Sequence, residues 1–127
     1  MIHKSPSHLM PTKAYMPAEW DKHTATWCCF PFNEENWYGY LHEVRLEYST
    51  FIQTLAKFEP VHLLCESQET LSIAQQYLTE SANISFHVVP LDDIWFRDNG
   101  PTFIRQDNRI DAIKWQFNAW GNKFPHQ

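Results

Sequence analysis

The sequence is poor in glycine and in basic residues, and it has no long apolar run. Its 127 residues include 3 glycines, and 10 Lys+Arg stand against 15 Asp+Glu, for a formal net charge of -5. With so few basic groups to neutralise phosphates, we expect neither nucleic acid nor an anionic membrane surface as a partner. No apolar stretch approaches the roughly 20 residues that cross a bilayer. The N-terminus lacks the continuous apolar segment of a secretory signal, so we expect a cytoplasmic protein.

Cysteine is also scarce. The three cysteines are Cys28, Cys29 and Cys65. An odd count with two adjacent members is a poor disulfide framework and indicates reduced thiols. Each lies in an apolar stretch without a basic neighbour to lower its pKa, and adjacent cysteines on a strand point apart. We therefore expect buried structural thiols rather than nucleophiles or zinc ligands.

Hydrophobic residues make up 43% of the chain and aromatic residues 16%, which is typical of one folded domain. Residues 1–18 contain three prolines and read as an extended leader, with the domain in residues 19–127. Apolar runs predict strands at 24–30, 61–65, 84–89, 102–105 and 110–117, with a turn at 107–109. Apolar stripes predict a five-turn helix from about Asn36 and a second helix from an N-cap at Ser67 to about Ser81. This order indicates an α/β fold, with helices covering one face of a mixed sheet.

The segment between the third and fourth predicted strands concentrates charge around an indole. It holds Asp92, Asp93, Trp95, Arg97 and Asp98. In one interpretation Arg97 clamps Asp92 or Asp93 and Trp95 fills the core. In the other, an aspartate binds a planar cation through paired hydrogen bonds while the indole stacks on it. Composition alone leaves both open.

This segment resembles the signature of the agmatine deiminases and the related bacterial peptidylarginine deiminases. Two further stretches resemble motifs of the same family in the same order. The three are 92–103 (DDIWFRDNGPTF), 16–20 (MPAEW) with His23, Thr26 and Trp27, and 115–123 (WQFNAWGNK). The resemblance covers nearly the whole chain but only about the first third of a typical family member.

The resemblance implies a pentein fold, an α/β propeller of five ββαβ-type units, of which this chain would supply about two. It implies hydrolysis of a guanidinium group, most simply that of agmatine, with no metal or organic cofactor. By motif position Asp98 is the catalytic carboxylate that grips the guanidinium, Trp95 the stacking wall, and Arg97 the residue that orients the loop. Asp92 and Asp93 brace the site. Asn118 and Trp120 either line the channel for the substrate's tail or cap the core.

The sequence also departs from the family. It contains neither the H-x-D motif that carries the family's catalytic histidine nor the glycine-rich motif that carries its nucleophilic cysteine. We therefore expect the chain to be inactive alone, and to self-associate or to lack a carboxyl-terminal portion. Two alternatives stay open: a catalytically inactive fragment, and a small aromatic-rich module that binds a sugar or another ligand.

Overall fold

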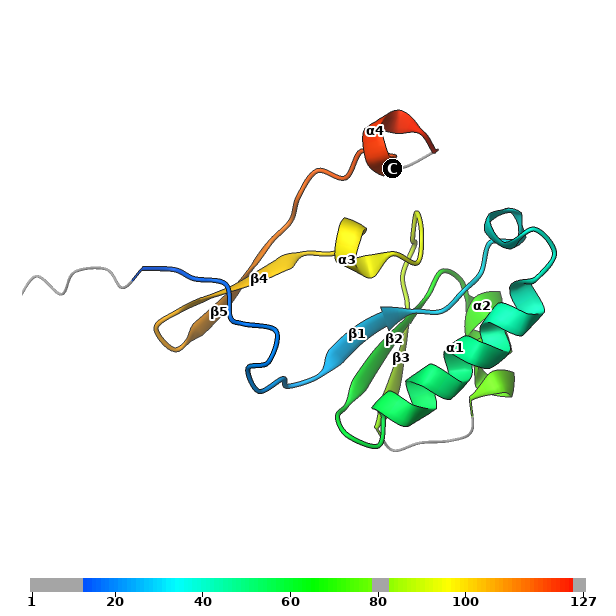
Figure 1. Ribbon diagram of the computed structural model, residues 1–127, viewed down its shortest axis with the longest axis horizontal. Helices are drawn as coiled ribbons and strands as arrows, with labels where there is room; N and C mark the ends of the chain where they lie inside the picture. Colours follow the sequence, from blue (N-terminus) through cyan, green and yellow to red (C-terminus); the bar gives the residue numbers. More distant parts are fainter. Residues whose placement is uncertain (1–12, 79–82, 125–127) are drawn as a thin grey trace, which may run out of the picture.

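The computed structural model describes residues 13–78 and 83–124 (Figure 1). The elements, in chain order, are β1 (Thr26–Cys29), the 3-10 helix η1 (Glu34–Trp37), α1 (Leu41–Leu55), β2 (Val61–Cys65), α2 (Gln68–Tyr77), β3 (Ile84–Val88), α3 (Phe96–Asn99), β4 (Thr102–Gln106), β5 (Arg109–Ile113) and α4 (Ala119–Asn122). The expected α/β class is confirmed. No helix in these two ranges is long and apolar enough to cross a membrane.

The strands pair in both directions, as expected, but they are divided between two sheets. β1, β2 and β3 form a parallel sheet in that order, with Thr26 opposite Val61 and Val61 opposite Ile84. β4 and β5 form a separate antiparallel hairpin. Parallel neighbours need crossover connections, and here α1 and α2 provide them.

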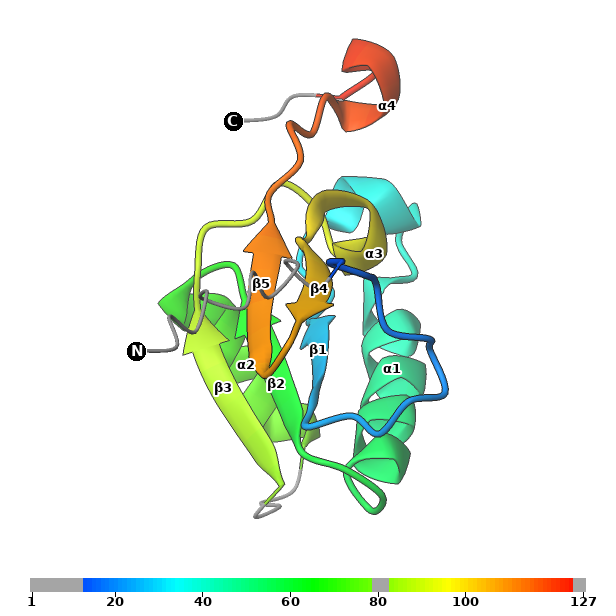
Figure 2. The same ribbon diagram turned by 90° about the vertical axis from the view of Figure 1, so that its left-hand side faces the viewer.

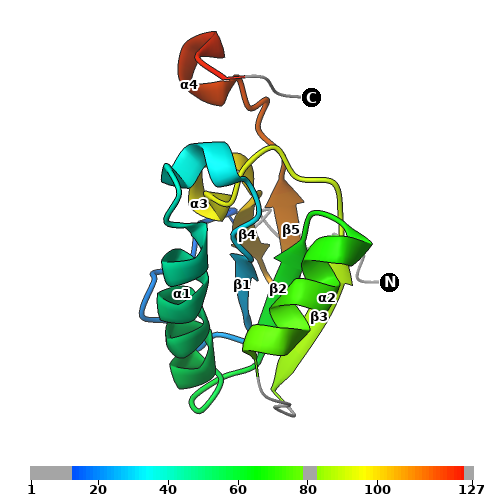
Figure 3. The ribbon, with the colours of Figure 1, turned by 90° about the vertical axis from the view of Figure 1, so that its right-hand side faces the viewer.

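Both crossover helices cover the same face of the parallel sheet, and the hairpin lies on the other side. Figure 3 shows α1 and α2 in front of the strands, whereas Figure 2 shows β4 and β5 in front of them. The core therefore lies between the helices and the sheet. Its fully buried side chains include Phe30, Ile52, Leu63 and Ala74. The far face of the sheet is covered by neither α1 nor α2, and the short α3 contacts it at β1.

The helix predictions differ from the structure at their ends. α1 begins at Leu41 rather than near Asn36, because Tyr38 and Gly39 both have positive φ (50° and 87°) and separate it from η1. The N-cap of α2 is confirmed: the Ser67 hydroxyl accepts a hydrogen bond from the Thr70 N–H at 3.1 Å. α2 ends at Tyr77, and the predicted end near Ser81 lies outside the described residues.

The five predicted strands are confirmed at their predicted positions in the chain. The predicted length is clearly wrong for one of them, β5. β5 ends at Ile113 instead of Phe117. Ile113 pairs with Thr102, the first residue of β4, and Pro101 before it has no N–H to continue the ladder. The predicted turn is present, with Asp107 at a φ of 55°.

The chain before β1 is partly described. Residues 1–12, most of the predicted leader, lie outside the described residues. Tyr15 forms an isolated antiparallel bridge with Arg105 of β4, through two backbone hydrogen bonds of 3.0 and 2.8 Å. The amino-terminal motif is thus attached to the hairpin that follows the charged loop.

Candidate functional site

The loop between β3 and β4 contains a single helical turn, α3. The Trp95 carbonyl accepts hydrogen bonds from the N–H groups of Asp98 (2.9 Å) and Asn99 (3.1 Å), and the Phe96 carbonyl accepts one from Gly100 (2.8 Å). A Cβ on Gly100 would lie 2.3 Å from the Phe96 oxygen. Only glycine therefore fits where the chain leaves this turn.

Asp93 stabilises the entry to the turn. Its carboxylate oxygen accepts a hydrogen bond from the Ile94 N–H at 2.7 Å, and its backbone carbonyl accepts one from the Asn99 side-chain amide at 3.0 Å. Both contacts stabilise the backbone of the loop, which is the bracing role that the resemblance implied for Asp93. They leave its second carboxylate oxygen as the part that a ligand could reach.

Trp95 and Asp98 stand at the exposed surface of the same turn. The Trp95 side chain is 52% exposed, so it does not fill the core as the structural interpretation required. Asp98 is exposed too, and no hydrogen bond within the described part of the chain engages its carboxylate. Recognition of a planar cation needs an indole face and a carboxylate whose oxygens can still accept hydrogen bonds, and this turn presents both.

Arg97 does not clamp either of the neighbouring aspartates. Its Nη1 lies 2.5 Å from Oε1 of Glu19, in the amino-terminal motif. The hydrogen bond and the charge of Arg97 lower the pKa of Glu19, and those of Glu19 raise the pKa of Arg97. Both side chains are largely exposed, so the pair contributes little to stability. The pair connects the amino-terminal motif to the charged loop. The spacing of the motifs in the sequence did not predict this contact.

Asn118 and Trp120 lie elsewhere. The Asn118 side chain accepts a hydrogen bond from the Gly121 N–H at 3.1 Å, and Trp120 packs edge-on against Phe117 and Phe124, with ring centroids 5.2 and 5.8 Å apart. α4 stands at the end of an extended segment, apart from α3 (Figure 1). The structure therefore does not bring these two residues to the loop, and their place in a substrate channel stays a prediction.

The far face of the parallel sheet carries an aromatic and imidazole cluster. Trp27 stacks on His62 with centroids 4.4 Å apart, and Nδ1 of His62 lies 2.9 Å from Nε2 of His87. Phe96 of α3 lies 6.5 Å from Trp27, centroid to centroid, so the charged loop rests on this cluster. Sequence reasoning missed it, although the period of two along each strand places these side chains on one face.

His23 has a structural role beside the amino-terminal motif. Its Nε2 lies 2.9 Å from the Glu19 carbonyl oxygen and its Nδ1 lies 3.3 Å from the Glu59 carboxylate. These contacts hold the backbone next to Glu19, the partner of Arg97. His23 therefore supports the charged loop indirectly.

The cysteines do not form a nucleophilic site. All three are buried and free. Burial raises the pKa of Cys29 to about 12 and that of Cys65 to about 11, and it also raises the pKa of Cys28. Thiols that hold their protons so firmly are poor nucleophiles at neutral pH, which confirms the structural interpretation. Within residues 13–78 and 83–124, no three His, Cys, Asp or Glu side chains gather as metal ligands.

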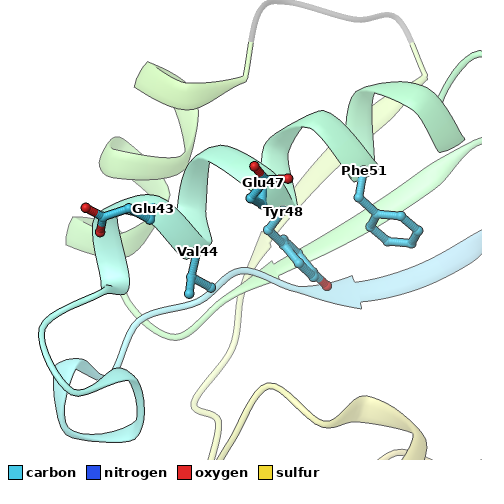
Figure 4. Close-up of a pocket in the computed structure, with 5 residues that line it drawn as sticks. All are labelled: Glu43, Val44, Glu47, Tyr48 and Phe51. Carbon is cyan, nitrogen blue, oxygen red and sulfur yellow. The ribbon is translucent and has the colours of Figure 1, made fainter.

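A surface hollow on α1 lies away from the charged loop. Its walls are Glu43, Val44, Glu47, Tyr48 and Phe51 (Figure 4). Burial raises the pKa of the Tyr48 hydroxyl, and the Cys28 thiol and the Cys29 backbone are close enough to contribute to it. Tyr48 lies against β1, the edge strand of the parallel sheet, and the lining of the hollow includes two glutamates but no cysteine or histidine.

The chain matches the family model of the Porphyromonas-type peptidyl-arginine deiminases over residues 15–127. It is 38% identical over 115 residues to the agmatine deiminase of Stutzerimonas stutzeri (strain A1501), which covers 86% of this chain and 29% of that protein. It is 36% identical over 107 residues to the agmatine deiminase of Pseudomonas aeruginosa (strain LESB58), covering 84% and 28%.

Solved structures give the same result. An agmatine deiminase of C. jejuni with substrate bound superposes with a TM-score of 0.77 at 28% identity, over 91% of this chain and 33% of that one. The agmatine deiminase of Enterococcus faecalis gives 0.76 at 26% identity, over 89% and 32%. This chain therefore belongs to the Porphyromonas-type peptidyl-arginine deiminase family, and it spans less than a third of the length of these two curated relatives.

Proposed function

We propose that the chain supplies the guanidinium-binding part of an agmatine deiminase-like hydrolase. The observation that carries this proposal is the pair of exposed side chains on one turn of the family loop, Trp95 and Asp98. A carboxylate can accept two parallel N–H groups from a guanidinium, and an indole can stack on its planar face. Asp93, beside the same turn, offers a second carboxylate.

The proposed reaction converts agmatine and water into N-carbamoylputrescine and ammonia, within putrescine biosynthesis in the cytoplasm. One C–N bond of the guanidinium breaks, and the carbon gains the oxygen of water. Here Asp98 would hold and orient the guanidinium, while Trp95 would exclude water from one face. The nucleophile and the general acid/base would come from groups outside this sequence, because the H-x-D and glycine-rich cysteine motifs are absent from it.

Agmatine is preferred to peptidyl-arginine as the substrate. The relatives compared above are named agmatine deiminases, and one solved relative is described with substrate bound. The excess of carboxylates over basic residues also suits a small cationic ligand. Peptidyl-arginine, in contrast, would present a backbone as well as a guanidinium.

The architecture forms part of the proposal. Residues 19–127 would be the amino-terminal portion of a pentein domain, about two of its five units, with residues 1–18 as a leader. The exposed side chains of Val88 in β3, Phe103 in β4 and Ile110 in β5 suit a surface that further units cover. Self-association of this chain would cover the same surface.

Agmatine binding tests the role of the loop. We expect the 127-residue chain to bind agmatine weakly, in the millimolar range on the order of 4 kcal/mol, because its site is open to water. Asp98→Asn keeps the size of the side chain and removes its charge, so it should abolish measurable heat in a calorimetric titration. Equal isotherms for the two proteins would exclude Asp98 from the site.

Catalysis is expected to be absent from the isolated chain. Its thiols are buried and protonated, and no cysteine or histidine of a catalytic motif is present. Incubation of the purified chain with agmatine should release no ammonia above the buffer background. Ammonia release that Asp98→Ala abolishes would show instead that this chain is an enzyme by itself.

A further inference from the structure

The loop carries a guanidinium of its own next to the proposed binding carboxylate. Arg97 precedes Asp98 in α3, and the Asp98 charge is close enough to contribute to the raised pKa of Arg97. Asp98 thus has two candidate partners, the ligand and the neighbouring arginine. An intramolecular partner acts at an effective concentration of about millimolar or more, so it competes strongly with a weak ligand.

In the structure Arg97 forms its ion pair with Glu19 rather than with Asp98. Nη1 of Arg97 lies 2.5 Å from Oε1 of Glu19. The backbone around Glu19 is fixed independently of α3: Asp21 N–H donates to the Ala18 carbonyl at 3.0 Å, and His23 contacts the Glu19 carbonyl at 2.9 Å. Glu19 is therefore a carboxylate placed from a separate segment.

We propose that Glu19 is a positioning residue that binds Arg97 and so keeps the Asp98 carboxylate open to an external guanidinium. This inference rests on the proposed function of the loop. Glu19 has two effects, and both favour the binding of an external guanidinium at Asp98. It accepts a hydrogen bond from Nη1 of Arg97 and so draws this side chain towards itself, and it balances a positive charge that would otherwise repel a cationic ligand.

Loss of the Glu19 charge should free Arg97 to pair with Asp98. We expect Glu19→Gln to weaken agmatine binding about threefold, the scale of an exposed ion pair. The double variant Glu19→Gln/Arg97→Gln removes the competitor as well and should recover most of that loss. If Glu19 only stabilised the fold of the loop, the double variant would bind as weakly as Glu19→Gln, because neither would contain the pair.

The chain offers a matched control. Arg109 and Asp111 form another exposed pair, at 2.9 Å, on the hairpin. Asp111→Asn removes the same kind of contact at a distance from the loop and should leave agmatine binding unchanged. Glu19→Asp keeps the charge and should bind more tightly than Glu19→Gln. Thermal melting of every variant checks that each is folded.

The experiment is one set of calorimetric titrations with agmatine on the full 127-residue chain. Weaker binding by Glu19→Gln, with recovery in the double variant, supports the inference. Unchanged binding by Glu19→Gln, or no recovery, overturns it while the difference between wild type and Asp98→Asn still upholds the proposed function. If wild type and Asp98→Asn are equal, the proposed function fails, and the inference fails with it.

Discussion

Leu63→Ala is expected to remove a large part of the free energy of unfolding, about 2–5 kcal/mol. Leu63 is in the central strand of the parallel sheet, fully buried beneath the helices, and pairs with Cys28 on one side and Phe86 on the other. Truncation removes buried methyl groups and leaves a cavity, which costs about 2–5 kcal/mol. Domains of this size have a total free energy of unfolding of about 5–15 kcal/mol, and a sheet of only three strands is expected to be near the lower limit.

Chemical denaturation followed by circular dichroism measures this loss. Leu46→Ala is the matched control, because it makes the same truncation on α1 at a side chain that is 50% exposed. We expect the control to change the free energy of unfolding by about 0.5 kcal/mol or less. Equal effects of the two substitutions would mean that Leu63 is not part of a packed core.

The buried thiols are expected to resist alkylation strongly. The pKa of Cys29 is raised from 9.0 to about 12 and that of Cys65 to about 11, primarily by burial. At pH 8 these shifts lower the thiolate fraction by about 10²–10³ relative to an exposed cysteine. Iodoacetamide should therefore modify Cys29 and Cys65 in the folded chain at least about a hundredfold more slowly than in urea.

The internal reference for this experiment is Ser85→Cys, on the exposed face of β3. That thiol should react at the rate of a free cysteine, in the same sample, while mass spectrometry follows each site. Fast modification of Cys29 in the folded chain would contradict the assignment of a buried, protonated thiol.

The same shifts predict how stability depends on pH. The folded chain keeps the protons of Cys29 and Cys65 at pH values where the unfolded chain has lost them. Unfolding therefore releases protons above about pH 9, and the free energy of unfolding should fall as the pH rises from there towards the folded pKa values of about 11 and 12. Below pH 8 both states hold these protons, so the thiols add no pH dependence.

Local features of the fold could be predicted from the sequence because each depends on neighbours in the chain. The apolar run 61–65 is a strand with the predicted bounds, and the Ser67 cap follows from its own side chain. The charged loop can be identified from the sequence for the same reason. Its residues are contiguous, and glycine at position 100 is required by an atom only four residues away.

The contacts that define the site could not be predicted in this way. Glu19 and Arg97 are separated by 78 positions, and their meeting depends on how the hairpin returns past the amino-terminal segment. The apolar residues of β1 predict a strand but not the cover of each face: Trp27 is 38% exposed, on the face that α1 and α2 do not cover. Hydropathy indicates how apolar a strand is, but not how many of its faces are covered.

The contact of Tyr48 with β1 has a consequence for how copies of this chain can aggregate. An unpaired strand edge is a template on which another chain can add a strand. At the β1 edge the Tyr48 hydroxyl lies close to the backbone of Cys29. A strand that adds at this edge would have to displace the Tyr48 side chain from the Cys29 backbone, so growth of an intermolecular sheet is hindered at β1.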